Sequence, residues 1–266
     1  MMNSKKLNPT VLCLSGFDPT GGAGIQADIE SIASMGAHAV SVITALTVQD
    51  THNVKSFTSV DPQQFLDQAN TLLNDVSINA IKIGMTGSLS IIESISTLLK
   101  QFPELPVIYD PVLAAGGGKN LANVELYAAI QDNILPYTTI LTPNSLEARL
   151  LTFEEDLKDS GLKLMQLGCE NVLITGTHEN SEHVDNLWFT EGRYKETFSW
   201  DRLPHEYHGS GCTLASAIAA LVAQGLDAFN SINEAQDYSW NALQHAFKIS
   251  ADGQRIPHRF YWQHSE

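Results

Sequence analysis

The chain has 266 residues and a mass of 29.1 kDa, with 30 acidic against 15 basic side chains and a formal net charge of −15. A hydrophobic content of 43% and a mean hydropathy of −0.08 are typical of a folded globular protein and exclude a disordered or fibrous chain. The acidic excess excludes a general binder of nucleic-acid backbones, because such binding needs clustered Lys and Arg.

Short β-branched runs alternate with helical patterns along the chain. In chain order the first half predicts strand Val11–Ser15, helix Gly22–Met35, strand Val40–Leu46, helix Gln63–Leu73, strand Ala80–Ile83, helix Leu89–Leu99 and strand Val107–Asp110. The second half predicts helix Val124–Ile134, strand Thr139–Leu141, helices Leu146–Leu151 and Leu157–Leu167, strand Val172–Ile174, a hairpin of Leu187–Phe189 and Tyr194–Phe198 at the sheet edge, and helices Cys212–Ala223 and Ile232–Ile249. In the first helix, one apolar face is expected to hold Ile25, Ile29, Ile32 and Ala33.

This alternation predicts an α/β fold, a three-layer α/β/α sandwich with a mostly parallel central sheet. The expected strands are apolar without strict alternation, as strands covered on both faces are. No linker, repeat or low-complexity stretch interrupts the pattern, so residues 1–266 are expected to form a single domain. Ligands of such sheets bind beyond the carboxyl ends of the strands, so the loops after strands are where functional residues are expected.

The cysteines predict a reducing compartment. Cys13, Cys169 and Cys212 lie far apart and form no C-x-x-C pair, so neither a disulfide framework nor a Cys-rich zinc site fits. Met1–Thr10 is not followed by an apolar signal-peptide region, and no apolar run approaches the roughly 20 residues of a membrane span. We expect a soluble, cytoplasmic protein without a membrane partner.

The first unusual loop is Gly16–Gly24, directly after the first strand. Its glycines allow backbone N–H groups to approach a ligand closely, and the following helix adds a positive dipole end. A tight strand-to-helix turn is the competing interpretation. The segment lacks Gly-Lys-Ser/Thr, so it is not a Walker P-loop, and it does not fit G-x-G-x-x-G, so a dinucleotide site is disfavoured.

A second glycine-rich junction, His208–Thr213, opens the Ala-rich helix. Glycines around a Ser at a helix N-terminus suit an anion site, although small residues that pack a helix start would look the same. Two such junctions in one chain favour the anion site. Cys212 would lie in the first helical turn, where the helix field is expected to lower the pKa of its thiol.

A third loop, Thr142–Glu147, has two interpretations. Asn144 and Glu147 have the spacing of a helix capping box, and they are also oxygen ligands that suit Mg²⁺ bound through water. Asp110, at the end of another strand, is a further acid expected to face the same cleft. Gln49 follows the second strand and offers a donor and an acceptor to a heterocycle edge, or is a solvated loop residue.

Together these motifs resemble the hydroxymethylpyrimidine/phosphomethylpyrimidine kinases of thiamine biosynthesis, which belong to the ribokinase-like superfamily. The resemblance covers about Val11 to Ala223. The matching blocks, in order, are Gly16-x-Asp18-Pro19-x-Gly21-Gly22-Ala23-Gly24-Ile25-Gln26-Ala27-Asp28, Val42-Ile43-Thr44-Ala45-Leu46-x-x-Gln49, Lys82-Ile83-Gly84-Met85, Asp110-Pro111-Val112, Thr142-Pro143-Asn144-x-x-Glu147-Ala148 and His208-Gly209-Ser210-Gly211-Cys212-Thr213-Leu214.

The resemblance implies ATP- and Mg²⁺-dependent phosphorylation of 4-amino-5-hydroxymethyl-2-methylpyrimidine and then of its monophosphate. It assigns the pyrimidine pocket to Gly16, Asp28, Gln49 and Met85. It assigns the metal to Asn144 and Glu147, with Asp110 nearby, and the ATP phosphates to Gly209, Ser210, Gly211 and Thr175. The catalytic group is Gly209, Gly211 and Cys212, and Cys212 stands where many ribokinase-like sugar kinases have Asp; it is expected to accept the substrate hydroxyl's proton or to lie beside that hydroxyl.

Two stretches depart from many relatives, which have a Lys after the Asp-x-Val block and Lys-Gly-Gly-His after a later strand. This chain has Leu113–Lys119 and Thr175–His178 instead, so Lys119 is a candidate replacement and the second phosphorylation stays open. The relatives suggest a homodimer, with Asn53–Val60 as a candidate lid or interface, and His258–Trp262 is expected to close the core. A pyridoxal kinase is the nearest alternative function, and a non-catalytic heterocycle-binding regulator is the weaker one.

Overall fold

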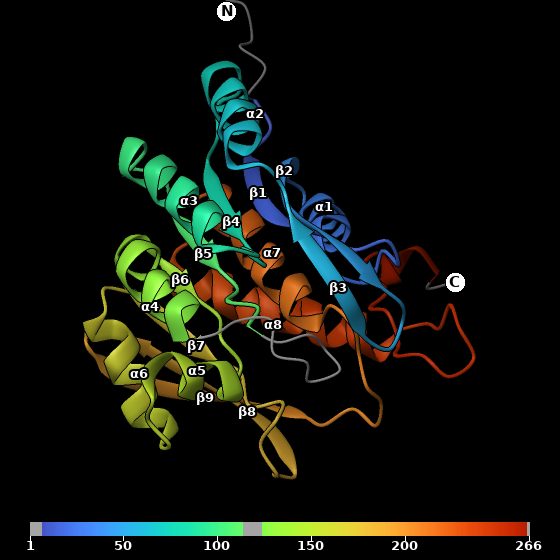
Figure 1. Ribbon diagram of the computed structural model, residues 1–266. Helices are drawn as coiled ribbons and strands as arrows, with labels where there is room; N and C mark the ends of the chain where they lie inside the picture. Colours follow the sequence, from blue (N-terminus) through green and yellow to red (C-terminus); the bar gives the residue numbers. More distant parts are fainter. Residues whose placement is uncertain (1–6, 114–123, 265–266) are drawn as a thin grey trace, which may run out of the picture.

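The computed structural model describes residues 7–113 and 124–264 and contains one sheet covered by helices on both faces (Figure 1). Its nine strands follow the order β3-β2-β1-β4-β5-β6-β7-β8-β9. The strands are β1 Thr10–Phe17, β2 His38–Gln49, β3 Val54–Ser59, β4 Ala80–Ile83, β5 Val107–Tyr109, β6 Ile140–Leu141, β7 Asn171–Ile174, β8 His183–Thr190 and β9 Arg193–Asp201. The six strands from β2 to β7 in that order are parallel, and β3, β8 and β9 pair antiparallel at the two edges.

The helices form the two outer layers. One layer holds α2 Pro62–Asp75, α3 Leu89–Gln101, α4 Val124–Asn133, α5 Ser145–Thr152 and α6 Leu157–Gln166. The other holds α1 Gly24–Ser34, α7 Ser210–Ala223 and α8 Ala228–Gln244. Alternate residues of β1 enter the two cores, Leu12 and Leu14 on one side and Val11 and Cys13 on the other, so the strand is apolar throughout. The predicted three-layer sandwich and edge hairpin are confirmed.

The structure corrects three details. In α1, Ile29 is 43% exposed and Ala33 is also exposed, because polar Asp28 and Ser31 take the inward positions. The last predicted helix ends at Gln244 instead of Ile249, since Phe247 pairs with Ile256 in an antiparallel bridge. The segment after Gln49 forms strand β3, whose mixed polar sequence lacks the apolar pattern of the central strands.

The chain ends against the layer of α1, α7 and α8. Arg259 is 2% exposed, and Tyr261 packs against the core of that layer, with its ring centroid 6.3 Å from that of Tyr238. The expectation that this segment closes the core therefore agrees with the structure, although Trp262 stays 43% exposed. Among the described helices, none is both long and apolar enough to cross a membrane. A single domain over residues 1–266 stays a prediction.

Candidate active site

A cleft of about 1130 Å³ lies at the carboxyl ends of the parallel strands, where open α/β sheets bind ligands. Residues from loops far apart in the sequence meet there. The predicted site residues that line it are Gly16, Gln49, Met85, Asp110, Asn144, Glu147, Thr175, Gly209, Ser210, Gly211 and Cys212. Asp28 is the exception, because its side chain is fully buried beneath the cleft. Lys119 lies outside the described residues.

The two glycine-rich turns touch each other through their backbones. Gly24 has φ +59° and Gly209 has φ +84°, a region that favours glycine. A Cβ added to Gly209 would overlap the carbonyl oxygen of Gly22, and one added to Gly24 would overlap that of Gly16. The glycines therefore allow the β1–α1 turn and the start of α7 to pack as one unit.

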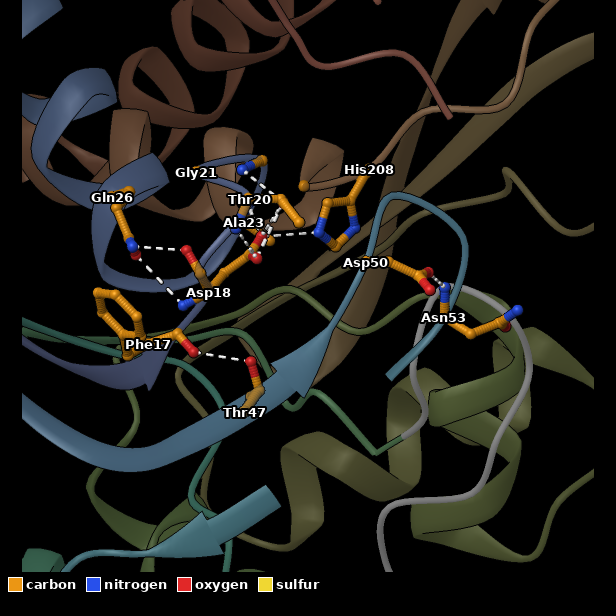
Figure 2. Close-up of polar contacts among 12 residues, drawn as sticks. Phe17, Asp18, Thr20, Gly21, Ala23, Gln26, Thr47, Asp50, Asn53 and His208 are labelled. Carbon is orange, nitrogen blue, oxygen red and sulfur yellow. Dashed lines mark hydrogen bonds and ion pairs between the residues drawn. The ribbon is translucent and has the colours of Figure 1, made fainter. Parts of the chain in front are cut away.

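The carboxylate of Asp18 ties these turns together (Figure 2). Its Oδ1 accepts from the backbone N–H of Thr20 at 2.8 Å, and its Oδ2 accepts from the N–H of Ala23 at 2.8 Å. The Nε2 of His208, from the residue before Gly209, lies 2.8 Å from the same Oδ2. Burial alone would raise the pKa of Asp18, but the hydrogen bonds from His208, Thr20 and Ala23 outweigh it and leave the pKa below its ordinary value of 3.8.

The lowered pKa of Asp18 predicts an acid-sensitive contribution to stability. Because the folded-state pKa lies below the unfolded value, the stabilisation is complete above the unfolded pKa and is lost as the pH falls through the folded one. We expect Asp18→Asn to lower the free energy of unfolding at pH 7 and to make little difference under strongly acid conditions. Urea titrations followed by circular dichroism at both pH values measure this; an equal loss at both would contradict the prediction.

The start of α7 presents backbone donors to the cleft. Gly209 is the N-cap of this helix, and no side chain caps it, so N–H groups of the first turn are available to an anion. Gly211 faces Asp110, since a Cβ placed on it would lie 3.5 Å from both carboxylate oxygens. Ser210 lies between these two glycines and lines the cleft with them.

Cys212 is a thiol in this environment, which corrects the expectation of a lowered pKa. The residue is 9% exposed, and burial raises the pKa of its thiol to about 12. Lys82 and the N–H of Gly24 oppose this shift, but the negative charges of Asp110 and Asp28 add to it. The sequence indicated only that the helix field would stabilise a thiolate. Burial removes the water that would solvate that thiolate, and this effect is larger. Asp110 is close enough to Cys212 for each group to influence the pKa of the other.

Asn144 and Glu147 form the capping box that the sequence left open. The Asn144 Oδ1 accepts from the N–H groups of Leu146 and Glu147, and the Glu147 Oε2 accepts from the Asn144 N–H at 3.0 Å. Glu147 is nevertheless buried beside Asp110. Burial first and the Asp110 charge second raise the pKa of Glu147 to about 8.

Asp110 is also buried and carries an oxygen without a hydrogen-bond partner, Oδ2. Burial raises its pKa to about 6, although Lys82 opposes that shift. The charge of Asp110 disfavours ionisation of Glu147, and a cation beside them would reverse that effect. In the parts of the chain that the structure describes, no cluster of three or more His, Cys, Asp or Glu forms a protein-only metal cage.

Lys82 and Asp28 form a buried ion pair under the cleft floor. The Lys82 Nζ lies 2.7 Å from the Asp28 Oδ1 and neither side chain is exposed. Lys82 also donates to Ser15 Oγ, and Ser216 Oγ donates to the same Asp28 Oδ1, while the buried Oδ2 has no hydrogen-bond partner. Burial would lower the pKa of Lys82, but the charges of Asp28 and Asp110 raise it overall. Lys82 lines the cleft, so Asp28 acts on the cleft through it.

The carboxyl ends of β1 and β2 and the loop after β4 also line the cleft. Gln49 is the last residue of β2, and Met85 follows β4 with its Sδ 3.4 Å from the place a Gly16 Cβ would take. Thr47 Oγ1 donates to the Phe17 carbonyl at 2.8 Å and joins the ends of β1 and β2 (Figure 2). This part of the cleft has an amide and a thioether beside open backbone, which suits a flat polar ring.

Sequence reasoning gave no role to Lys82, Asp18 or His208. For Lys82 a signal existed: a Lys inside the apolar strand Ala80–Ile83 requires a buried partner, and Asp28 lies among the apolar residues of α1. The Asp18–His208 pair joins residues 190 positions apart, and no local pattern predicts it.

Known proteins share both the sequence and the fold. A model of the phosphomethylpyrimidine kinase family matches residues 18–256. The hydroxymethylpyrimidine/phosphomethylpyrimidine kinase of Escherichia coli K12 is 34% identical over 250 residues, 91% of this chain and 92% of that one. The phosphomethylpyrimidine kinase of Clostridium difficile 630 superposes with a TM-score of 0.77 at 30% identity, over 88% of this chain and 98% of that one.

An ADP complex of Bacillus subtilis pyridoxal kinase gives a TM-score of 0.86 at 25% identity, over 96% of this chain and 98% of that one. The ribokinase-like fold expected from the sequence is thereby confirmed. Because the family match extends from the first glycine-rich turn through α8 and beyond, this chain belongs to the phosphomethylpyrimidine kinase family.

Proposed function

We propose that the chain transfers the γ-phosphoryl group of ATP to the hydroxymethyl group of 4-amino-5-hydroxymethyl-2-methylpyrimidine, for thiamine biosynthesis. The observation that carries this proposal is one cleft that is lined both by Gln49 and Met85 and by the start of α7. A flat acceptor and the phosphates would therefore meet beside Cys212. The E. coli relative carries the name of this activity, and the Bacillus subtilis relative binds ADP on the same fold.

Backbone donors are the main source of phosphate binding in this proposal. Among the described residues that line the cleft, the Lys and Arg side chains are Lys82 and Arg202. Gly209, Ser210 and Gly211 offer N–H groups and the positive end of α7, which stabilise charge on phosphoryl oxygens without a basic surface. Thr175 lines the same cleft next to Asn144 and is the remaining candidate phosphate contact.

Mg²⁺ fits the acidic pair Asp110 and Glu147, which line the cleft. Asp110 has a buried oxygen without a partner, and the raised pKa of Glu147 reflects a second carboxyl group that lacks a counter-charge. Mg²⁺ is usually held by one or two carboxylates together with phosphates and water. Asp110 and Glu147 would hold it, with Asn144 through water, and it would neutralise charge on the ATP phosphates.

The transfer forms one bond from the substrate oxygen to the γ-phosphorus and breaks the bond from that phosphorus to the β–γ bridging oxygen. The hydroxyl proton has to leave. Cys212 lines the cleft, where its sulfur can accept this proton after its own thiol proton has left to solvent, so that Asp110 stays ionised for the metal. ADP departs with the bridging oxygen, so the proton and the charge both balance.

Cys212 variants test this role. We expect Cys212→Ala to lower kcat about 100-fold or more, because the proton then has no side-chain acceptor, and Cys212→Ser to retain part of the activity. ADP release under saturating substrates measures kcat. Cys169→Ala is the matched control, since that buried cysteine lies against Leu135 and away from the cleft. Unchanged kcat in both Cys212 variants would contradict the role.

The acceptor range is tested by ADP release with three acceptors: the pyrimidine alcohol, its monophosphate and pyridoxal. We expect the highest kcat/KM with the alcohol. Turnover of the monophosphate would establish the second transfer, and its absence would define a single-step kinase. Pyridoxal is the second candidate acceptor, because the Bacillus subtilis pyridoxal kinase has the same fold and both compounds are flat rings with a hydroxymethyl group.

A homodimer and a cytoplasmic location stay predictions. Strand β2 offers Leu46, 51% exposed, and Val48, 58% exposed, beside the edge strand β3. Burial of these side chains by a second copy would remove apolar surface from water. Light scattering during size-exclusion chromatography, with Val48→Lys as a comparison, measures the mass of the assembly.

A further inference from the structure

Arg259 is the largest fully buried side chain among the described residues, and it comes from the segment after α8. Its guanidinium donates to backbone and side-chain oxygens of both glycine-rich turns. Nη2 lies 2.5 Å from the Gly22 carbonyl oxygen, Nη1 lies 3.4 Å from that of Gly21, and Nε lies 3.1 Å from the Thr213 Oγ1. Nη1 also pairs with Glu30 at 2.9 Å.

These bonds continue into the cleft on both sides. The Gly22 carbonyl belongs to the same peptide as the Ala23 N–H, which donates to Asp18, and Asp18 pairs with His208. On the other side, Thr213 Oγ1 donates to the Gly209 carbonyl at 2.8 Å, the N-cap of α7. Arg259 is thus bonded to both glycine-rich turns from outside the cleft, while the N–H groups at the start of α7 face the cleft.

Arg259 is itself held in place. Its carbonyl oxygen accepts from the Tyr238 hydroxyl at 3.1 Å and from the Ser34 Oγ at 2.5 Å. Burial of a guanidinium is costly, and its one carboxylate partner, Glu30, is 47% exposed. An apolar side chain would fill a core position without that cost. The planar guanidinium of Arg has several N–H donors, and at this position they bind two carbonyl oxygens and a hydroxyl oxygen at the same time.

We propose that Arg259 is a positioning residue for phosphoryl transfer, which keeps the two glycine-rich turns in the register that aims the α7 N–H groups at the transferred phosphoryl group. The inference rests on the proposed function. Arg259 lies beyond residue 256, where the family match ends, and it is not among the residues that line the cleft. It therefore acts through the turns and not on the substrate.

The test compares Arg259→Lys and Arg259→Met with a matched control, Arg149→Lys. Arg149 also donates to a backbone carbonyl, that of Glu155 at 2.9 Å, and pairs with a carboxylate, Glu179 at 2.7 Å, but it belongs to another layer and does not line the cleft. For Arg259→Lys we expect kcat to fall about 10-fold and for Arg259→Met about 100-fold, because misplacement of a reacting group has effects of this size. The KM for the pyrimidine alcohol is expected to stay within about 2-fold, since Gln49 and Met85 are not bonded to this unit.

All assays run well below the unfolding midpoint of each variant, measured by circular dichroism, so that loss of folded protein does not enter kcat. A purely structural Arg259 would lower the midpoint and leave kcat unchanged in the folded Lys variant, and that result would overturn the inference alone. Arg149→Lys is expected to keep the wild-type kcat. An inactive wild-type protein would instead overturn the proposed function and this inference with it.

Discussion

Replacement of Lys82 by Met is expected to lower the free energy of unfolding by about 3–5 kcal/mol, the cost of leaving one charge of a buried pair without its partner. Asp28 would keep Ser216 as a hydrogen-bond donor, but its charge would face an apolar core. Urea denaturation at neutral pH, followed by circular dichroism, measures the loss.

The double variant Lys82→Met with Asp28→Leu distinguishes the effect of an unpaired buried charge from the effect of changed side-chain packing. It removes both charges, so we expect it to recover most of the stability that the single variant loses. Arg193→Met is the control for an exposed pair, because Arg193 and Glu191 are 64% and 68% exposed, and its unfolding midpoint is expected to stay close to wild type. A double variant no more stable than Lys82→Met would show that the two charges do not depend on each other.

Gly209→Ala is expected to lower kcat by about 100-fold or more while the KM for the pyrimidine alcohol changes little. The new Cβ would overlap the Gly22 carbonyl oxygen, so either the start of α7 or the first turn has to move, and the anion-binding N–H groups move with it. Gln49 ends β2 and Met85 follows β4, so neither side chain belongs to the two turns that have to move. Steady-state ADP release with each substrate varied in turn measures both constants.

Gly192→Ala is the matched control for this substitution. Gly192 has φ +72° at the tip of the β8–β9 hairpin, and a Cβ there would have no heavy atom within 4 Å. It carries the same backbone penalty, about 1–2 kcal/mol, without the overlap. We expect wild-type kcat from Gly192→Ala. A similar kcat in the two alanine variants would mean that contact between the turns does not position the donors.

The sequence predicts the layers of this fold because each central strand and each covering helix carries its own apolar period. Ala80–Ile83 has the bounds that the structure gives β4. Strand β3 was not predicted because an edge strand is exposed on one side and tolerates Lys55 and Ser56. The end of α8 was misplaced because a pairing with the distant Ile256, and not a local breaker, stops it.

Site residues were predictable where they directly follow a strand, as Asp110 does, or stand at the start of a helix, as Gly209 does. The pKa shifts were harder to predict from the sequence. The field of α7 favours a Cys212 thiolate, but the burial of Cys212, which only the structure shows, raises the pKa of its thiol. Arg259 reaches Gly21 across 238 residues, and nothing in its local sequence indicates that contact. Long-range polar contacts of this kind come from the packing of the whole chain.

The −15 charge of the chain agrees with a cleft that holds anions mainly through backbone N–H groups and, in our proposal, a divalent cation. The phosphoryl transfer itself is therefore the central claim. Its most direct test is identification of the product by ³¹P NMR after incubation with ATP, Mg²⁺ and the pyrimidine alcohol. We predict a new phosphomonoester resonance that forms together with ADP and is absent from Cys212→Ala on the same timescale. ATP that stays intact with the alcohol, or that is consumed with pyridoxal alone, would contradict the account.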